Sequence, residues 1–205
     1  MLREVTEEIP KPQVLCDDAE WPKVVKALYD RNLVVPVQTR PTVEGVPVLN
    51  GAFGVVKPEK FTDTGLPVLR MIIDLIRASN TILEQLEGDV NTLTGAASFQ
   101  KLMLGPEEEL LVSGDDLNSA FYLFRLPPSW PPYLALRKPV PWAVLDPSKS
   151  GETLVGICVL PMGWSSAVAV MQSAHRQLAL RTELDFGAGL LGKSEIRKDA
   201  VFPFP

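Results

Sequence analysis

The chain has 205 residues, of which 46% are hydrophobic and 22% are charged. This balance excludes a chain that is disordered throughout, because it is enough to build a substantial buried core. The net charge of −5 argues against nucleic-acid binding by bulk positive charge, so any such site has to be local.

The cysteine pattern and the N-terminal sequence bear on location. Cys16 and Cys158 are the two cysteines, and they show no C-x-x-C spacing. The first ten residues, MLREVTEEIP, lack the basic start and apolar run of a signal peptide. We therefore expect an intracellular protein in a reducing compartment, either the cytoplasm or the nucleus.

The first half of the chain predicts one helix followed by strands. Residues 19–33 place Trp21, Val24, Val25 and Leu28 at the spacing of an amphipathic helix. Residues 34–60 mix β-branched residues with Pro and Gly, which favours short strands and turns. Residues 65–76 then form an apolar run that predicts a longer strand.

The second half predicts a sheet with two helices. A helix is expected over residues 87–104, followed by strands at Leu110–Gly114, Tyr133–Lys138 and Leu154–Leu160, and by a strong helix over Ser165–Leu180. We expect the three strands to share one antiparallel sheet with the last helix packed on one face. Because the elements show no βαβ rhythm, the predicted class is α+β.

Residues 153–174 carry no charged side chain over a length that would span a bilayer as a helix. Pro161 and Gly163 interrupt the middle of this segment, and serines add polarity. The pattern therefore predicts a strand, a turn and a buried helix, with no membrane partner.

Two adjacent carboxylates, Asp115 and Asp116, follow the predicted strand at Leu110–Gly114. A carboxylate at a strand end can hold Mg²⁺, which prefers oxygen ligands from few protein side chains together with phosphate and water. The alternative is that this Asp-Asp pair only begins a turn, since Asp is common in turns.

Three blocks of sequence resemble reverse transcriptases, and they occur in that family's order. FGVVKPEK followed by LRMIIDLIRASN is similar to the fingers segment, DDLNSAFYLFRLP to the first catalytic palm motif, and LPMGWSSAVAVMQSAHRQL to the second palm motif. The blocks cover roughly residues 49–180 and most closely resemble retrotransposon polymerases of protists. The resemblance implies an α+β fold made of reverse-transcriptase-like fingers and an incomplete palm. Residues 1–45 would form the N-terminal helical or extended region of the fingers, residues 46–105 the fingers themselves, and residues 106–205 the partial palm.

The resemblance also assigns roles to the catalytic motif. Asp116 would hold Mg²⁺ or Mn²⁺, with the Leu117 carbonyl as a second contact, for template-directed transfer of deoxynucleotides onto a primer. Phe121 would block the 2′-hydroxyl of a ribonucleotide, and its alternative is an ordinary core aromatic. Arg70 and Lys57 would neutralise the triphosphate, while an exposed surface role stays open for Lys57.

The LPMGW turn would contact both the nucleotide and the template. Met162 cannot donate a hydrogen bond, and Gly163 would let a base pair approach the backbone closely. Trp164 is predicted to be a packing residue. The implied partners are an RNA or DNA template with its primer, deoxynucleoside triphosphates, and the remaining palm and thumb segments.

No Y-x-D-D sequence follows the second palm motif, and no thumb is recognisable. We therefore expect a fragment that extends no primer by itself, because one carboxylate cannot position two metal ions. Two alternatives stay open. One is a non-catalytic interaction or structural protein derived from a polymerase fragment. The other is an unrelated α+β hydrolase that uses Asp116, which lacks a base partner.

Overall fold

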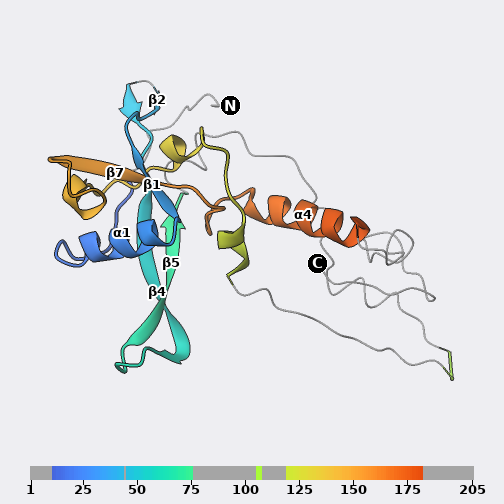
Figure 1. Ribbon diagram of the computed structural model, residues 1–205. Coiled ribbons are helices and arrows are strands. Elements are labelled where there is room, and N and C mark those ends of the chain that lie inside the picture. The colour runs from blue at the N-terminus through green and yellow to red at the C-terminus, as the bar shows by residue number, and fades with distance from the viewer. Residues whose placement is uncertain (1–10, 44, 76–104, 108–118, 182–205) are drawn as a thin grey trace. The chain divides into compact units, whose positions relative to one another are not determined.

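The computed structural model describes residues 11–43, 45–75, 105–107 and 119–181. The chain divides into two compact units, Met1–Gln85 with Ser119–Ser165, and Leu86–Asn118 with Ser166–Pro205. Figure 1 shows the helices and the antiparallel strands of the described residues. The predicted α+β class is therefore confirmed as a combination of helices with antiparallel sheets.

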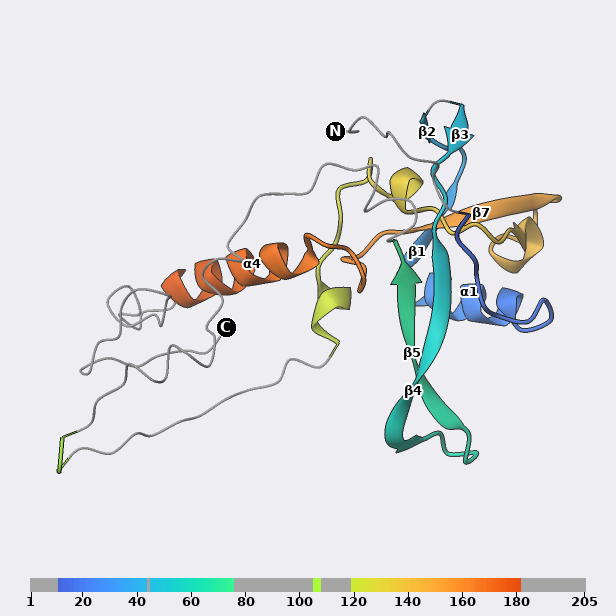
Figure 2. The same ribbon diagram turned by 180° about the vertical axis from the view of Figure 1, so that it is seen from behind.

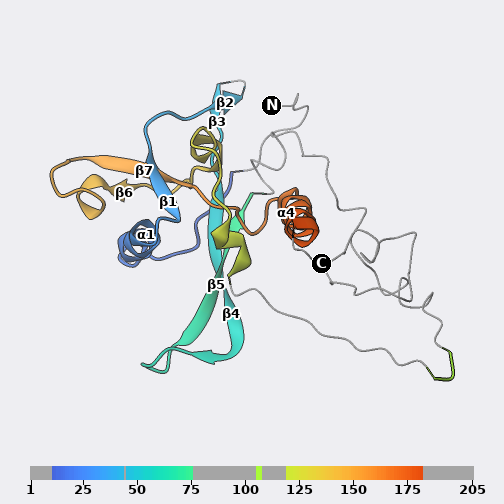
Figure 3. The ribbon, with the colours of Figure 1, turned by 45° about the vertical axis from the view of Figure 1, so that its right-hand side comes forward.

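Helix α1 spans Trp21–Asp30, as its apolar spacing predicts. Pro22 in the first turn fixes a helical φ where no intrahelical donor is needed. The side chains of Trp21 and Val25 are buried, and the Trp21 indole donates to the carbonyls of Lys138 and Pro139 at 3.1 Å each. These contacts fix the helix beside strands β1, Val34–Val37, and β6, Val140–Pro141 (Figure 3).

The first unit contains a three-stranded antiparallel sheet in the order β1-β7-β6. Strand β7, Glu152–Ile157, is central and pairs with β1, Val34–Val37, and with β6, Val140–Pro141. Pro36 is tolerated in β1 because this strand has a free edge that needs no donor. Smaller elements are the β2–β3 hairpin, Thr42–Val43 with Val46–Pro47, and the single turns η2, Ala120–Leu123, and η4, Trp142–Val144.

The predicted strand at Tyr133–Lys138 is wrong as an extended element. Pro131 begins a single 3₁₀ turn, η3, Pro131–Leu134, because two adjacent prolines preset φ and supply no backbone donors. Only Ala135 and Leu136 then form isolated bridges, to Gly156 and Asn50. The segment therefore connects β7 to the start of β4, Gly51–Phe61, through these two bridges, and the ladder partners of β7 are β1 and β6.

Strands β4, Gly51–Phe61, and β5, Pro67–Asp74, form a long antiparallel hairpin (Figure 2). The strand predicted over residues 65–76 is thus confirmed. The ladder is regular from Gly51 to Val56 and then shifts register before Phe61. The outer part of the hairpin is exposed, whereas Ala52 and Ile73 near its base are buried.

In the second unit, helix α4 spans Ala167–Arg181, close to the predicted Ser165–Leu180. The segment 153–174 is therefore strand, turn and helix, as Pro161 and Gly163 predict. No helix in the described part of the chain combines the length and apolarity needed to cross a membrane. The predicted helix at 87–104 and strand at Leu110–Gly114 lie outside the described residues.

Candidate functional site

The two predicted triphosphate ligands lie on neighbouring strands of the β4–β5 hairpin. Arg70 is exposed and pairs across the ladder with Val55, and Lys57 comes two positions after Val55 on the same strand. Lys57 follows the last regular pair, Val56 with Leu69, after which the register of the ladder shifts. Lys57 is half-buried and has a polar partner. The hairpin therefore carries one of these two cations on each strand.

The LPMGW turn lies against the base of the same hairpin. The Ile73 amide of β5 donates to the Met162 carbonyl at 3.2 Å. Gly163 has φ +114°, and a Cβ there would lie 2.3 Å from the Ile73 carbonyl oxygen. The glycine is therefore required by strand β5, which supplies a reason other than the expected approach of a base pair.

Trp164, the last residue of the turn, is 5% exposed and packs edge-on against Trp130 with ring centroids 5.4 Å apart. Its amide donates to the Pro161 carbonyl at 3.3 Å and closes the turn. Trp164 is thus the packing residue that the sequence predicts.

Phe121 lies in the short turn η2, which follows Ser119 at φ 57°. Its ring is half-buried. The neighbouring Tyr122, which the sequence did not single out, is the residue of this turn that reaches the base of the hairpin.

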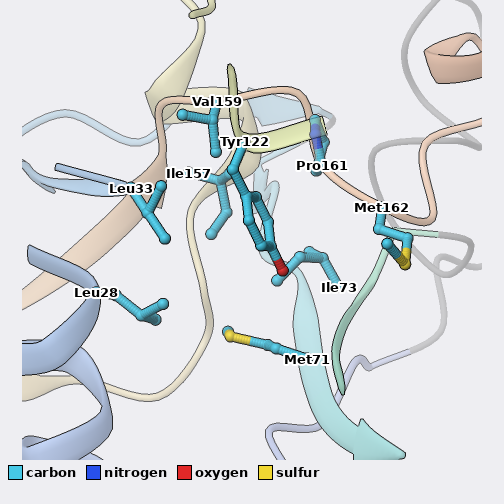
Figure 4. A pocket seen from close by; sticks show the side chains of 9 residues that line it. All are labelled: Leu28, Leu33, Met71, Ile73, Tyr122, Ile157, Val159, Pro161 and Met162. Atoms are coloured by element: carbon cyan, nitrogen blue, oxygen red, sulfur yellow. The ribbon is translucent and has the colours of Figure 1, made fainter. Parts of the chain in front are cut away.

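Tyr122, Met71, Ile73, Pro161 and Met162 gather around one small apolar cavity, together with Leu28, Leu33, Ile157 and Val159. Figure 4 shows the Tyr122 ring extending inward, with its hydroxyl near Ile73 and Met71. The cavity of about 20 Å³ has room for about one water molecule and none for a nucleotide. The cavity lies where β5, η2 and the LPMGW turn pack against one another. A nucleotide would therefore have to bind outside it.

Arg70 and Phe121 are each the sequence neighbour of a residue that lines the cavity. Because successive side chains of a strand alternate, Arg70 faces away from the cavity that Met71 lines. The structure therefore brings together the backbone segments of the three predicted motifs. It does not gather Lys57, Arg70, Phe121 and Met162 around one cavity.

Asp116 and Leu117, the predicted metal contacts, lie outside the described residues. Within the described ranges, no group of three or more His, Cys, Asp or Glu side chains could hold a metal ion. By donor type, a single Asp carboxylate suits Mg²⁺ or Mn²⁺, which both favour oxygen ligands.

A further polar cluster, which the sequence did not reveal, surrounds Cys158. The Arg125 guanidinium donates to Cys158 Sγ at 3.2 Å and also to the Asn32 carbonyl, and the Cys158 thiol donates to the same carbonyl at 3.2 Å. Burial raises the pKa of the Cys158 thiol, and the nearby Arg125 charge offsets part of that rise. A thiol with a raised pKa is a poor nucleophile at neutral pH. The hydrogen bonds of the cluster link the segments that carry Asn32, Arg125 and Cys158.

No model of a known protein family matches the sequence, and no curated protein matches it.

Proposed function

We propose that the chain is the fingers and part of the palm of a retroelement reverse transcriptase, with fingers over 46–105 and partial palm over 106–205. Its part in that reaction is to bind a deoxynucleoside triphosphate against a primer and template. The protein would act inside the cell, in the cytoplasm or the nucleus.

The observation that carries the proposal is the hydrogen bond from the Ile73 amide to the Met162 carbonyl. It joins the fingers-like strand β5 to the LPMGW turn, two segments almost ninety residues apart. Tyr122, from the segment that follows Asp116, lines the same cavity as Met71 and Met162. A polymerase site needs these three segments to converge, and a chance resemblance of separate motifs does not require it.

The proposed roles follow from side-chain chemistry. The Arg70 guanidinium offers a planar fork of donors to phosphate oxygens, and the Lys57 ammonium offers a point charge two positions along the hairpin. Phe121 would limit the space at the sugar. Mg²⁺ or Mn²⁺ held by Asp116 would supply charge stabilisation of the phosphoryl group and activation of the attacking hydroxyl.

Binding of a fluorescent deoxynucleoside triphosphate to the purified chain tests the proposal. We expect Mg²⁺-dependent binding that weakens in Asp116→Asn and in Arg70→Gln. Arg31→Gln is the matched control, because Arg31 is also exposed and, within the described part of the chain, donates only to the Ala27 carbonyl of α1. The proposal would be overturned if binding did not depend on Mg²⁺ and had equal affinity in the wild type and the three variants.

The second candidate is a non-catalytic interaction protein, and one observation favours it. The outer part of the β4–β5 hairpin exposes large apolar side chains, with Phe61 at 66%, Leu66 at 64% and Leu69 at 58%. Exposed apolar groups clustered on one element often mark contact surfaces. Sedimentation velocity tests this candidate: association that rises with protein concentration and disappears in Phe61→Ser/Leu69→Ser would support it, and a monomer at all concentrations would exclude self-association.

A further inference from the structure

An open groove of about 480 Å³ lies between residues 11–14 and residues 137–139, and its lining includes no residue that the sequence motifs assign to nucleotide binding. Both walls are held by the start of strand β4. The Gln13 carbonyl accepts from the Ala52 amide at 3.0 Å, and the Arg137 amide donates to the Asn50 carbonyl at 2.9 Å. These backbone hydrogen bonds fix the two walls relative to each other, so the groove exists before any ligand binds.

Among the residues that the structure describes, the side chains that line the groove carry positive charge and no carboxylate. Lys11 and Arg137 are exposed, and neither forms an ion pair within the part of the chain that the structure describes. Lys138 is tied to the Asp18 carboxylate at 2.6 Å and to the Cys16 carbonyl at 2.5 Å. Because the Asp18 carboxylate balances the charge of Lys138, the local positive charge of the groove comes from Lys11 and Arg137, on a chain whose net charge is −5.

The two separate exposed cations favour a polyanion over a single small anion. The groove is open to solvent with Lys11 on one wall and Arg137 on the other, and a strand with several linked phosphates offers each cation a phosphate of its own. Within the described ranges no aromatic ring lines the groove, since its other lining residues are Pro12, Gln13, Val14 and Pro139. Stacking on bases is therefore unavailable, and contacts to phosphate carry no sequence preference.

We propose that this groove binds the phosphate backbone of a single-stranded nucleic acid, with Lys11 and Arg137 as its two phosphate contacts. The inference rests on the proposed function, in which such a strand would be the template. It adds a binding site to which the motif resemblance assigns no residue.

The test is the salt dependence of binding of fluorescent oligo-dT and oligo-dA to the full chain, measured by anisotropy. Each phosphate contact with a single strand contributes about 0.7 to the slope of log K against log salt. We expect Lys11→Gln/Arg137→Gln to weaken binding equally for both oligonucleotides and to lower the slope by about 1.4. Each single variant should lower it by about 0.7.

The matched control is Lys23→Gln/Arg31→Gln, which removes the same charge from exposed positions on and beside α1. The control should keep the wild-type slope. Equal losses in the two double variants would mean that bulk charge attracts the strand, and the proposal would be overturned. It would also be overturned if inorganic phosphate, matched to chloride in ionic strength, displaced the oligonucleotides at millimolar concentration, since the groove would then be a site for the free anion.

The outcome is separable from that of the proposed function. Suppose that Lys11→Gln/Arg137→Gln lowers the slope of log K against log salt as expected, but that the chain shows no Mg²⁺-dependent nucleotide binding. This result would support strand binding in the groove and reject the polymerase assignment. Nucleotide binding that responds to Asp116→Asn, with an unchanged salt slope, would do the reverse.

Discussion

At the scale of single residues, Gly163 has a steric reason for its identity that stability measurements can test. A Cβ at this position would lie 2.3 Å from the Ile73 carbonyl oxygen, and φ is +114°. We expect Gly163→Ala to lower the free energy of unfolding by about 2–4 kcal/mol. Urea unfolding followed by tryptophan fluorescence measures this in the first unit, which contains all four tryptophans.

The matched control for Gly163 is Gly65→Ala. Gly65 also has a positive φ, +76°, but a Cβ there would meet nothing within 4 Å. Its cost should be confined to backbone strain, about 1 kcal/mol. Equal losses in the two variants would contradict a role for the close approach to β5.

The Cys158 thiol predicts a dependence of stability on pH. Burial raises its pKa above the ordinary value of 9.0, with a partial offset from Arg125. A raised pKa in the folded state means that the stabilisation is complete below the unfolded pKa and is lost as pH rises through the folded pKa. The free energy of unfolding should therefore fall above about pH 9, and more steeply in the wild type than in Cys158→Ala. Parallel declines in urea titrations of the two proteins would contradict this assignment.

Phe121 is tested by sugar selectivity in a longer, active polypeptide that carries both acidic motifs. If its ring limits the space at the sugar, Phe121→Ala should admit ribonucleotides, because the clash with the 2′-hydroxyl is removed. Tyr122→Phe is the control, since it changes the neighbouring ring that lines the apolar cavity. Unchanged selectivity for deoxynucleotides in Phe121→Ala would leave Phe121 as a packing residue.

At this scale, only part of the candidate site could be predicted from the sequence. The motif spacing pointed to Phe121 and Gly163, but it gave no means of telling that Tyr122 would reach the hairpin base. The contact of Gly163 with Ile73 joins residues ninety positions apart, and no local pattern encodes such a distance.

At the scale of elements, Asn50 joins strand β4 to the segment after η3. Its side-chain amide is buried and donates to the carbonyls of Tyr133 and Ala135 at 3.1 and 3.2 Å. We expect Asn50→Ala to cost about 2–4 kcal/mol, because it leaves the Tyr133 carbonyl without this donor and opens a small cavity. Urea unfolding measures the loss.

Thr153→Ala is the comparison for Asn50. Thr153 is also buried, but its hydroxyl donates only to the adjacent Leu154 carbonyl at 3.1 Å. Removing it disconnects no element, so the expected cost is about 1 kcal/mol. A loss in Asn50→Ala no larger than this would show that Asn50 does not join the two segments.

Strong periodicity made some elements predictable. The amphipathic spacing of α1 and the apolar run of β5 are local signals, and both elements form as expected. The segment at Tyr133–Lys138 has strand-like composition, but Pro131 and its neighbouring proline override it by starting the η3 turn. The pairing of β1 with β7 joins distant segments and could not be predicted from either segment alone.

At the scale of the whole molecule, the net charge is negative, whereas the charge of the groove is positive. The net charge is −5, yet the groove carries the exposed cations Lys11 and Arg137. Composition predicts that any nucleic-acid site is local, and this stays a prediction, whereas only the fold brings residues 11–14 beside residues 137–139. Sequence motifs and structure thus contribute different parts of the proposed polymerase.

Photolabelling with an azido deoxyadenosine triphosphate, followed by mapping of the modified peptides, tests the central claim most directly. The account predicts Mg²⁺-dependent labelling in the β4–β5 hairpin and in residues 119–125 or 161–164, suppressed by unlabelled deoxynucleotide and by Asp116→Asn. Labelling that is insensitive to Mg²⁺ and to Asp116→Asn, or that maps only to α1, would contradict a polymerase nucleotide site in this chain.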